Sequence, residues 1–236
     1  MKLTGASVAL GSGEKIPHIK KVIPRVNDRR VNTRKALWTM PQQSLHMTAL
    51  EINHSLTASE IAALVSQFPA SALEAMANYT RTHRARLVKP LLSYDSQALA
   101  LSFLPAAGES RTDSSSLSDP DRKVPDSDSY TYHHLRRDLF TQATSAGVKV
   151  GSRYVVPSAH LTIARFVREQ DFDVERFVEV IEGVNEWLVR EFWPKDDEGI
   201  KAGGEWVVGE EKGLEVRKGT LWYGGGGETV VLGEGF

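Results

Sequence analysis

Two short stretches of the chain alternate apolar and polar residues, as a β-strand with one buried face does. Residues 44–52 and residues 159–166 both show this pattern, and a proline precedes each of them. Successive side chains of a strand point to opposite faces, so each stretch is expected to bury one face and present the other. The polar face of each carries a histidine followed two positions later by a threonine. These pairs are His46 with Thr48 and His160 with Thr162.

Helical periodicity follows each of the two strands. After the first strand, Thr57 and Glu60 have the spacing of a capping box, and apolar residues recur at helical intervals as far as Pro69. After the second strand, an apolar stripe from Val174 to Phe192 predicts the longest helix of the chain. The other predicted elements are helices at about 71–83 and 130–146, and strands at 86–93, 98–104, 205–208, 214–216, 221–223 and 229–232.

The two strands form a weak internal repeat. Their histidines are 160 − 46 = 114 residues apart, which leaves room for one lobe between the two copies. Several predicted strands are joined by connections short enough for hairpins. This favours an α+β fold with antiparallel sheets over a doubly wound parallel sheet.

Two segments lack this periodicity. Residues 1–35 are predicted to be a basic, partly flexible N-terminal arm, either a solvated tail or a contact for a nucleic-acid backbone. Residues 105–129 are rich in Ser and Asp and poor in large apolar side chains, so we expect a flexible insertion there. Residues 36–236 are then predicted to form a single bilobal domain.

Composition narrows the class of protein. Of the 236 residues 41% are hydrophobic and 25% are charged, and the net charge of −1 shows that the chain is no polycation built for nucleic acid. There are no cysteines, which excludes disulfides, cysteine-ligated zinc and a cysteine nucleophile. No apolar run is long enough to span a membrane. We expect a soluble intracellular protein, assigned to the cytoplasm without excluding the nucleus.

Two His-x-Thr strands in one chain resemble the two-histidine (2H) phosphoesterase superfamily, which includes the LigT-like RNA 2′,5′-ligase/phosphodiesterases and the cyclic nucleotide phosphodiesterases. The second copy is similar to the LigT-type form because Arg165 stands three positions after its threonine. The first copy has Glu51 at the equivalent position. The resemblance implies a bilobal, pseudo-two-fold arrangement of antiparallel sheets with flanking helices. Each lobe would contribute one His-x-Thr strand to a shared cleft.

The resemblance also implies a chemistry. Histidine titrates nearest neutral pH, so His46 and His160 are implied as the acid/base pair that opens a 2′,3′-cyclic phosphate or cleaves a 2′-5′ link. Thr48 and Thr162 are implied as contacts to the phosphate. The candidate substrate contacts are Arg165, Phe166 and Tyr154. Strand parity places Arg165 on the face opposite the histidine, unless the strand twists or ends there. The substrate would be RNA or a nucleotide carrying a cyclic phosphate, with no metal and no cofactor, and we expect a monomer.

A second class of function fits the same motifs: a non-catalytic nucleotide- or RNA-binding module in which the histidines only hold phosphate. Two intact acid/base positions favour catalysis. The adjacent pair His133 and His134 is expected on a solvated helix face, and the remaining histidines are assigned no role. The glycine run at 224–227 is predicted to be a hairpin turn, because it lacks the strand-to-helix context of a phosphate-binding loop.

Overall fold

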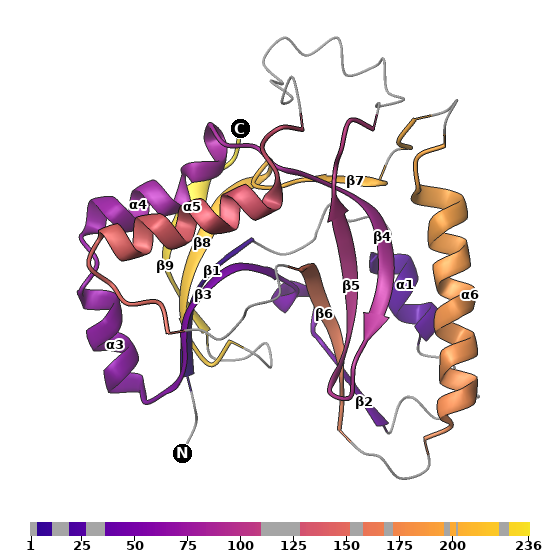
Figure 1. The fold of residues 1–236 in the computed structure, drawn as a ribbon. Coiled ribbons are helices and arrows are strands. Elements are labelled where there is room, and N and C mark those ends of the chain that lie inside the picture. The colour runs from indigo at the N-terminus through magenta and orange to yellow at the C-terminus, as the bar shows by residue number, and fades with distance from the viewer. Residues whose placement is uncertain are drawn as a thin grey trace.

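The computed structural model describes residues 4–10, 19–26, 36–109, 128–151, 158–167, 172–195, 199–201, 203–221 and 227–236 (Figure 1). Within these ranges one antiparallel sheet is flanked by helices. Its strands are β1 (Thr4–Leu10), β2 (Leu37–Thr39), β3 (Met47–Leu56), β4 (Arg86–Tyr94), β5 (Ala98–Pro105), β6 (Ala159–Phe166), β7 (Glu205–Val207), β8 (Lys212–Gly219) and β9 (Gly227–Glu234). The helices are α1 (Ile19–Val26), α3 (Ala58–Ser66), α4 (Ala70–Ala77), α5 (Tyr132–Ser145) and α6 (Val174–Phe192), with 3₁₀ turns η2 (Gln42–Ser44) and η3 (Tyr79–Arg81).

The sheet consists of two halves that meet at one point. The strand order is β7-β4-β5-β6-β3-β1-β8-β9, and β2 pairs with the end of β6 on the edge away from β5. Strands β3 and β6 join the halves through a single register pair, Met47 opposite Leu161. Each of these residues directly follows a motif histidine, so the halves meet at equivalent positions of the repeat. The predicted α+β class and the pseudo-two-fold, two-lobed arrangement are confirmed, with the two lobes continuous through this pair.

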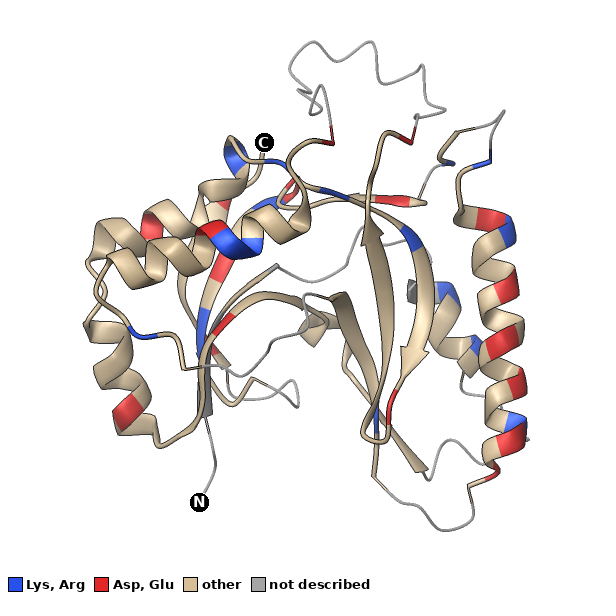
Figure 2. Ribbon diagram, viewed as in Figure 1, with Lys and Arg blue, Asp and Glu red and all other residues tan. Residues whose placement is uncertain are grey.

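Helices cover each half of the sheet. In Figure 1, α3, α4 and α5 lie over the half that contains β3, whereas α6 and α1 lie beside the half that contains β6. The predicted capping box is present: the Thr57 amide donates to a carboxylate oxygen of Glu60 at 2.7 Å, and the Glu60 amide donates to the Thr57 hydroxyl. Helix α6 buries its apolar stripe, and Figure 2 shows a series of acidic residues along its outer side. No helix in the described ranges is long and apolar enough to cross a membrane.

The N-terminal segment differs from the irregular arm that its composition predicted. Strand β1 lies inside the sheet, between β3 and β8. Val8 and Ala9 are fully buried there. Helix α1 buries Val22 and Val26 against the core and contacts α6. The basic residues suggested a solvated arm, but the apolar residues between them are enough to fix two elements.

A buried arginine ties together the two ends of the predicted insertion. Arg86 of β4 is 8% exposed and forms ion pairs with Asp128 and Glu205, and it also donates to the backbone oxygen of Glu109. Glu109 and Asp128 flank residues 110–127, which lie outside the described ranges, so the flexibility predicted there stays a prediction. The limits of the bilobal domain also stay a prediction. Most of the predicted strand at 221–223 and of the predicted turn at 224–227 lies outside the described ranges.

Candidate active site

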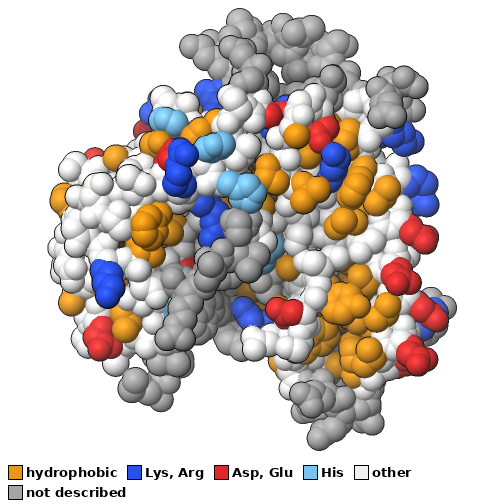
Figure 3. All heavy atoms as spheres, in the orientation of Figure 1, with side chains coloured by type: hydrophobic (Ala, Val, Ile, Leu, Met, Phe, Trp, Pro, Cys, Tyr) orange, Lys and Arg blue, Asp and Glu red, His pale blue; other side chains and the backbone are white. Residues whose placement is uncertain are grey.

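A cleft of 170 Å³ opens where the two halves of the sheet meet. In Figure 3, histidine and positively charged side chains gather along the boundary between the halves. Most of the side chains that line the cleft come from β3 and β6 or the residues just before them. The lining residues are Met40, His46, Thr48, Glu51, His160, Thr162 and Arg165. Both His-x-Thr pairs therefore face the same space.

The strand geometry explains why these four side chains converge. Met47 and Leu161 are fully buried on the core face of the sheet. Their neighbours on each strand must then point to the other face, into the cleft. The two strands run antiparallel through this pair. His46 is therefore next to Thr162 of the other strand, and His160 is next to Thr48.

A backbone carbonyl fixes the ring of His46. The Nδ1 atom lies 2.8 Å from the carbonyl oxygen of Ser44, which can only accept a hydrogen bond. Nδ1 therefore carries the proton, and Nε2 of the neutral ring is left with a lone pair. The turn η2 begins after Pro41 and ends at Ser44, and it is this turn that presents the carbonyl to the ring.

His160 is held in the equivalent way. Its Nδ1 lies 2.9 Å from the hydroxyl of Ser158, and a hydrogen bond to the backbone of Ser158 raises the pKa of the ring. Ser44 and Ser158 each stand two residues before their histidine, so the internal repeat includes the residue that orients the ring. This relation was missed from the sequence, although the two serines occupy matching positions.

Burial lowers the pKa of both histidines below the usual value. For His46 burial is the largest cause, and the positive charges of Arg217 and Arg165 lower the pKa further, against the Ser44 carbonyl and Glu215, which raise it. For His160 burial is again the largest cause, with Arg136 and His46 acting in the same direction and the Ser158 backbone and Asp95 opposing them. Both rings therefore favour the neutral form at neutral pH, the form that a general base needs.

Arg165 lines the cleft because of a β-bulge in β6. On β5, Ala100 lies opposite Thr162 but its neighbour Leu99 lies opposite Ala164, so Ile163 is an extra residue in β6. Ile163 and Ala164 are buried in succession, and the alternation resumes one position out of phase. The expectation from strand parity, which placed Arg165 on the opposite face, is wrong for this reason.

The first copy of the repeat has the same bulge. On β1, Ala9 lies opposite Thr48 and Val8 lies opposite Leu50, which leaves Ala49 as the extra residue. Ala49 and Ile163 are equivalent positions, since 163 − 49 is also 114. The bulge turns Glu51 into the cleft at the place where the other half has Arg165. Two consecutive apolar residues before a charged one, in both copies, were the sequence signal for this pair.

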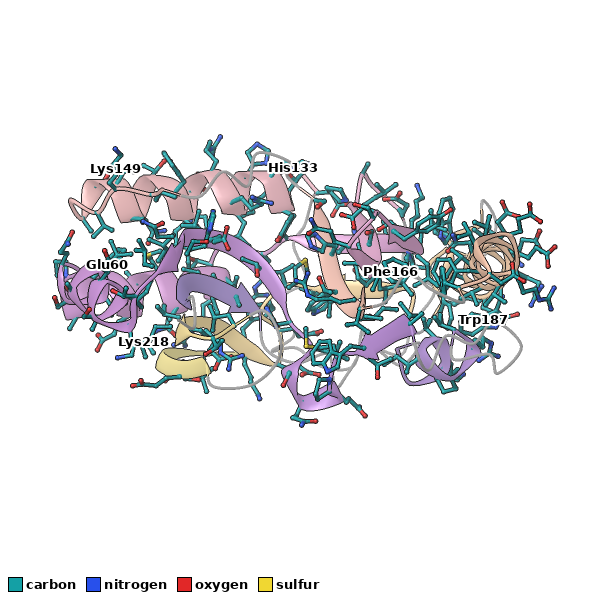
Figure 4. The ribbon with its side chains drawn as sticks, turned by 90° about the horizontal axis from the view of Figure 1, so that it is seen from below. Glu60, His133, Lys149, Phe166, Trp187 and Lys218 are labelled. Carbon is teal, nitrogen blue, oxygen red and sulfur yellow. The ribbon has the colours of Figure 1, made fainter. Side chains whose placement is uncertain are left out.

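Phe166, another predicted substrate contact, lies elsewhere. The ring of Phe166 packs edge-on against Phe177 at 5.6 Å between centroids, and against Phe172 at 5.5 Å. Figure 4 shows Phe166 on the side of α6, in agreement with these contacts, and it does not line the cleft. Tyr154 lies outside the described residues.

The remaining histidines of the described ranges do not line the cleft. His134, expected on a solvated face, accepts a hydrogen bond from the Thr131 amide at 3.1 Å and so caps the start of α5. His133 beside it is exposed. Across the described ranges, no group of three or more histidine, aspartate or glutamate side chains has an arrangement that could hold a metal ion.

Comparisons with known proteins give structural likeness at low sequence identity. No family model and no curated protein matches the chain. A solved protein of unknown function from Agrobacterium tumefaciens is similar with a TM-score of 0.53 at 13% identity, covering 98% of this chain and 86% of that one. Escherichia coli LigT, solved with 3′-AMP, has a TM-score of 0.45 at 12% identity over 100% and 99% of the two chains. Kluyveromyces marxianus Usb1 has a TM-score of 0.39 at 12% identity over 97% of each chain.

The likeness to the Agrobacterium protein shows a shared fold and no more. LigT is among the solved structures to which the chain is similar. The chain thus combines a known two-lobed fold with two His-x-Thr strands that face one cleft.

Proposed function

We propose that the chain is a metal-independent phosphodiesterase that opens 2′,3′-cyclic phosphates, or cleaves 2′-5′ links, in RNA or nucleotides. The observation that carries the proposal is the pairing of two ring-oriented histidines with two threonine hydroxyls around a single cleft. Hydrolysis at phosphorus needs a base to activate water and an acid to protonate the departing ribose oxygen. His46 and His160 supply these two groups: both rings favour the neutral form in the free cleft, and the negative charge of a bound phosphate raises the pKa of the ring that then acts as the acid.

The reaction follows from the roles of these groups. One histidine takes a proton from water through Nε2 while the water oxygen forms a bond to phosphorus. The other histidine gives its proton to the ribose 3′ oxygen as the bond from phosphorus to that oxygen breaks, which leaves a 2′-phosphate. Thr48 and Thr162 donate hydrogen bonds to the non-bridging oxygens, where negative charge increases in the transition state. Arg165 adds a positive charge on the same face of the cleft.

Strand positions make the arrangement rigid. All four side chains project from two paired strands with fully buried neighbours, and both histidine rings are fixed at Nδ1. Preorganised groups of this kind contribute to catalysis because they need little reorganisation when the charge develops.

The test is a hydrolysis assay in the presence of EDTA. The substrates are 2′,3′-cyclic nucleotides and a short RNA with a cyclic phosphate end, and the products are resolved as 2′- or 3′-phosphates. Turnover to a 2′-phosphate should be lost in His46→Ala and in His160→Ala, since each histidine contributes roughly 10²- to 10⁴-fold. His54→Ala is the matched control, because His54 lies on β3 but does not line the cleft.

Two outcomes would contradict the proposal. Turnover that persists in both histidine variants would remove the acid/base pair from the mechanism. Tight nucleotide binding by wild type without turnover of any substrate would establish the binding module instead.

A further inference from the structure

Among the polar side chains that line the cleft, the two halves differ at one position. Each half contributes a histidine, a threonine and, after the bulge, a charged side chain five positions beyond the histidine. That side chain is Glu51 in one half and Arg165 in the other. We propose that Glu51 determines specificity: it faces the nucleoside of the substrate, accepts its hydrogen bonds, and disfavours a second phosphate on that side. The inference rests on the proposed function, because it concerns the substrate of the same cleft.

The symmetric groups alone cannot orient a substrate. Exchanging the two halves about the Met47–Leu161 pair places one histidine on the other and one threonine on the other. A phosphate held by these four groups would therefore bind equally well in two opposite orientations. Only a group that differs between the halves can distinguish them, and the charges at the bulged position have opposite signs.

The chemistry of the two side chains assigns each a different part of the ligand. A guanidinium donates several hydrogen bonds in a planar fork that fits phosphate oxygens, so the Arg165 side favours the anionic group. An ionised carboxylate only accepts hydrogen bonds, and a nucleoside offers ribose hydroxyls and base amino groups as donors. The nucleoside is therefore expected on the Glu51 side. A further phosphate there would meet a like charge in a partly buried site, where screening by water is reduced.

Other charged groups near the half that contains Glu51 do not reverse the sign of the charge there. Arg217 and Glu215 of β8 both act on the pKa of His46, so they also face this region. Their side chains lie 3.6 Å apart as an ion pair, which makes their combined field weak at a distance. Glu51 is the charged side chain of this half that lines the cleft itself.

The test measures equilibrium binding of two ligands that cannot react further. Adenosine 2′-phosphate has the form of the proposed product, and adenosine 2′,5′-bisphosphate adds one phosphate to the same nucleoside. The quantity compared is the ratio of the two dissociation constants. Glu51→Gln should shift this ratio roughly tenfold in favour of the bisphosphate, the effect expected from removing one like charge several ångströms away.

Two further variants separate charge from shape and from net charge. Glu51→Asp keeps the carboxylate and should keep the ratio close to that of wild type. Glu74→Gln removes the same charge from an exposed position on α4 and should leave the ratio unchanged. A ratio that stays at the wild-type value in Glu51→Gln, or that moves equally in Glu74→Gln, would overturn the proposal. So would a loss of the wild-type ratio in Glu51→Asp.

Failure of this inference and failure of the proposed function give different results. If the protein hydrolyses its substrate but the ratio of dissociation constants does not depend on Glu51, the inference alone is rejected. Binding that depends on Glu51 as expected, without hydrolysis, would reject catalysis and keep the assignment of Glu51. Binding of neither ligand by the wild-type protein would reject both.

Discussion

Tyr132 connects helix α5 to the strand that carries the first motif. It is the first residue of α5 and is fully buried. Its hydroxyl donates a hydrogen bond of 3.0 Å to the backbone carbonyl of Thr48. Tyr132→Phe removes that hydroxyl and leaves the ring in place, so the change isolates one hydrogen bond beside the cleft.

The cost of losing the hydrogen bond between Tyr132 and Thr48 can be estimated from the burial of its two partners. Water cannot reach a fully buried hydroxyl site, so the carbonyl of Thr48 loses this partner without a replacement. Such a loss costs about 1–3 kcal/mol of unfolding free energy. For a chain of this size the melting temperature falls by about 2–4 °C per kcal/mol, which predicts a decrease of about 2–12 °C. A shift of the Thr48 hydroxyl away from its place in the cleft would also lower kcat/KM, by up to about 10²-fold.

Urea unfolding and cyclic-phosphate hydrolysis measure the two effects. The control is Tyr79→Phe, which removes a hydrogen bond of similar length to Asp138. Asp138 keeps its bonds from Tyr130 and Arg137, so that variant should change stability by less than about 0.5 kcal/mol. If Tyr132→Phe is as stable and as active as Tyr79→Phe, the hydrogen bond to Thr48 holds neither the fold nor the site.

Three further predictions concern stability. Arg86→Met removes the positive charge beside the carboxylates of Asp128 and Glu205 and should cost about 3–5 kcal/mol in urea unfolding; a loss under 1 kcal/mol would show that these charges are solvated. Burial lowers the pKa of His46 and His160, so the unfolded chain binds more protons near pH 6 and the unfolding free energy should fall as the pH drops below about 6.5. The double variant with alanine at both positions should lose less unfolding free energy than the wild type between pH 7.5 and 5.5. Equal losses in the two proteins would contradict the predicted direction of the pH dependence. Gly233→Ala would bring a Cβ within 2.0 Å of a backbone oxygen and should destabilise by about 1–3 kcal/mol, whereas Gly183→Ala, with open space in α6, should stabilise by up to about 1 kcal/mol in thermal unfolding.

Local patterns in the sequence were sufficient for most elements and for the central residues of the site. Alternation around His46 and His160 predicted two strands with their polar faces outward, and both strands are present. The spacing of Thr57 and Glu60 predicted a helix start that the hydrogen bonds confirm. These features depend only on neighbours along the chain, so one sequence contains the information.

Features that depend on a partner strand were missed. A bulge is two residues opposite one, so neither Ala49 nor Ile163 can be recognised as extra without the register of β1 or β5. For that reason Glu51 was not expected in the cleft and Arg165 was expected on the wrong face. Strand β1 was missed for a related cause, since its order comes from pairing with β3 and β8 rather than from its own short apolar pattern.

The position of β1 between β3 and β8 has a consequence for biosynthesis. The half of the sheet that carries His46 begins with residues near the start of the chain and receives β8 only after Gly219 has been translated. Until then one edge of β1 has no partner strand, and exposed strand edges promote association between nascent chains. Contacts this distant in sequence also form slowly. The growing chain is therefore expected to need protection by chaperones until β8 pairs with β1.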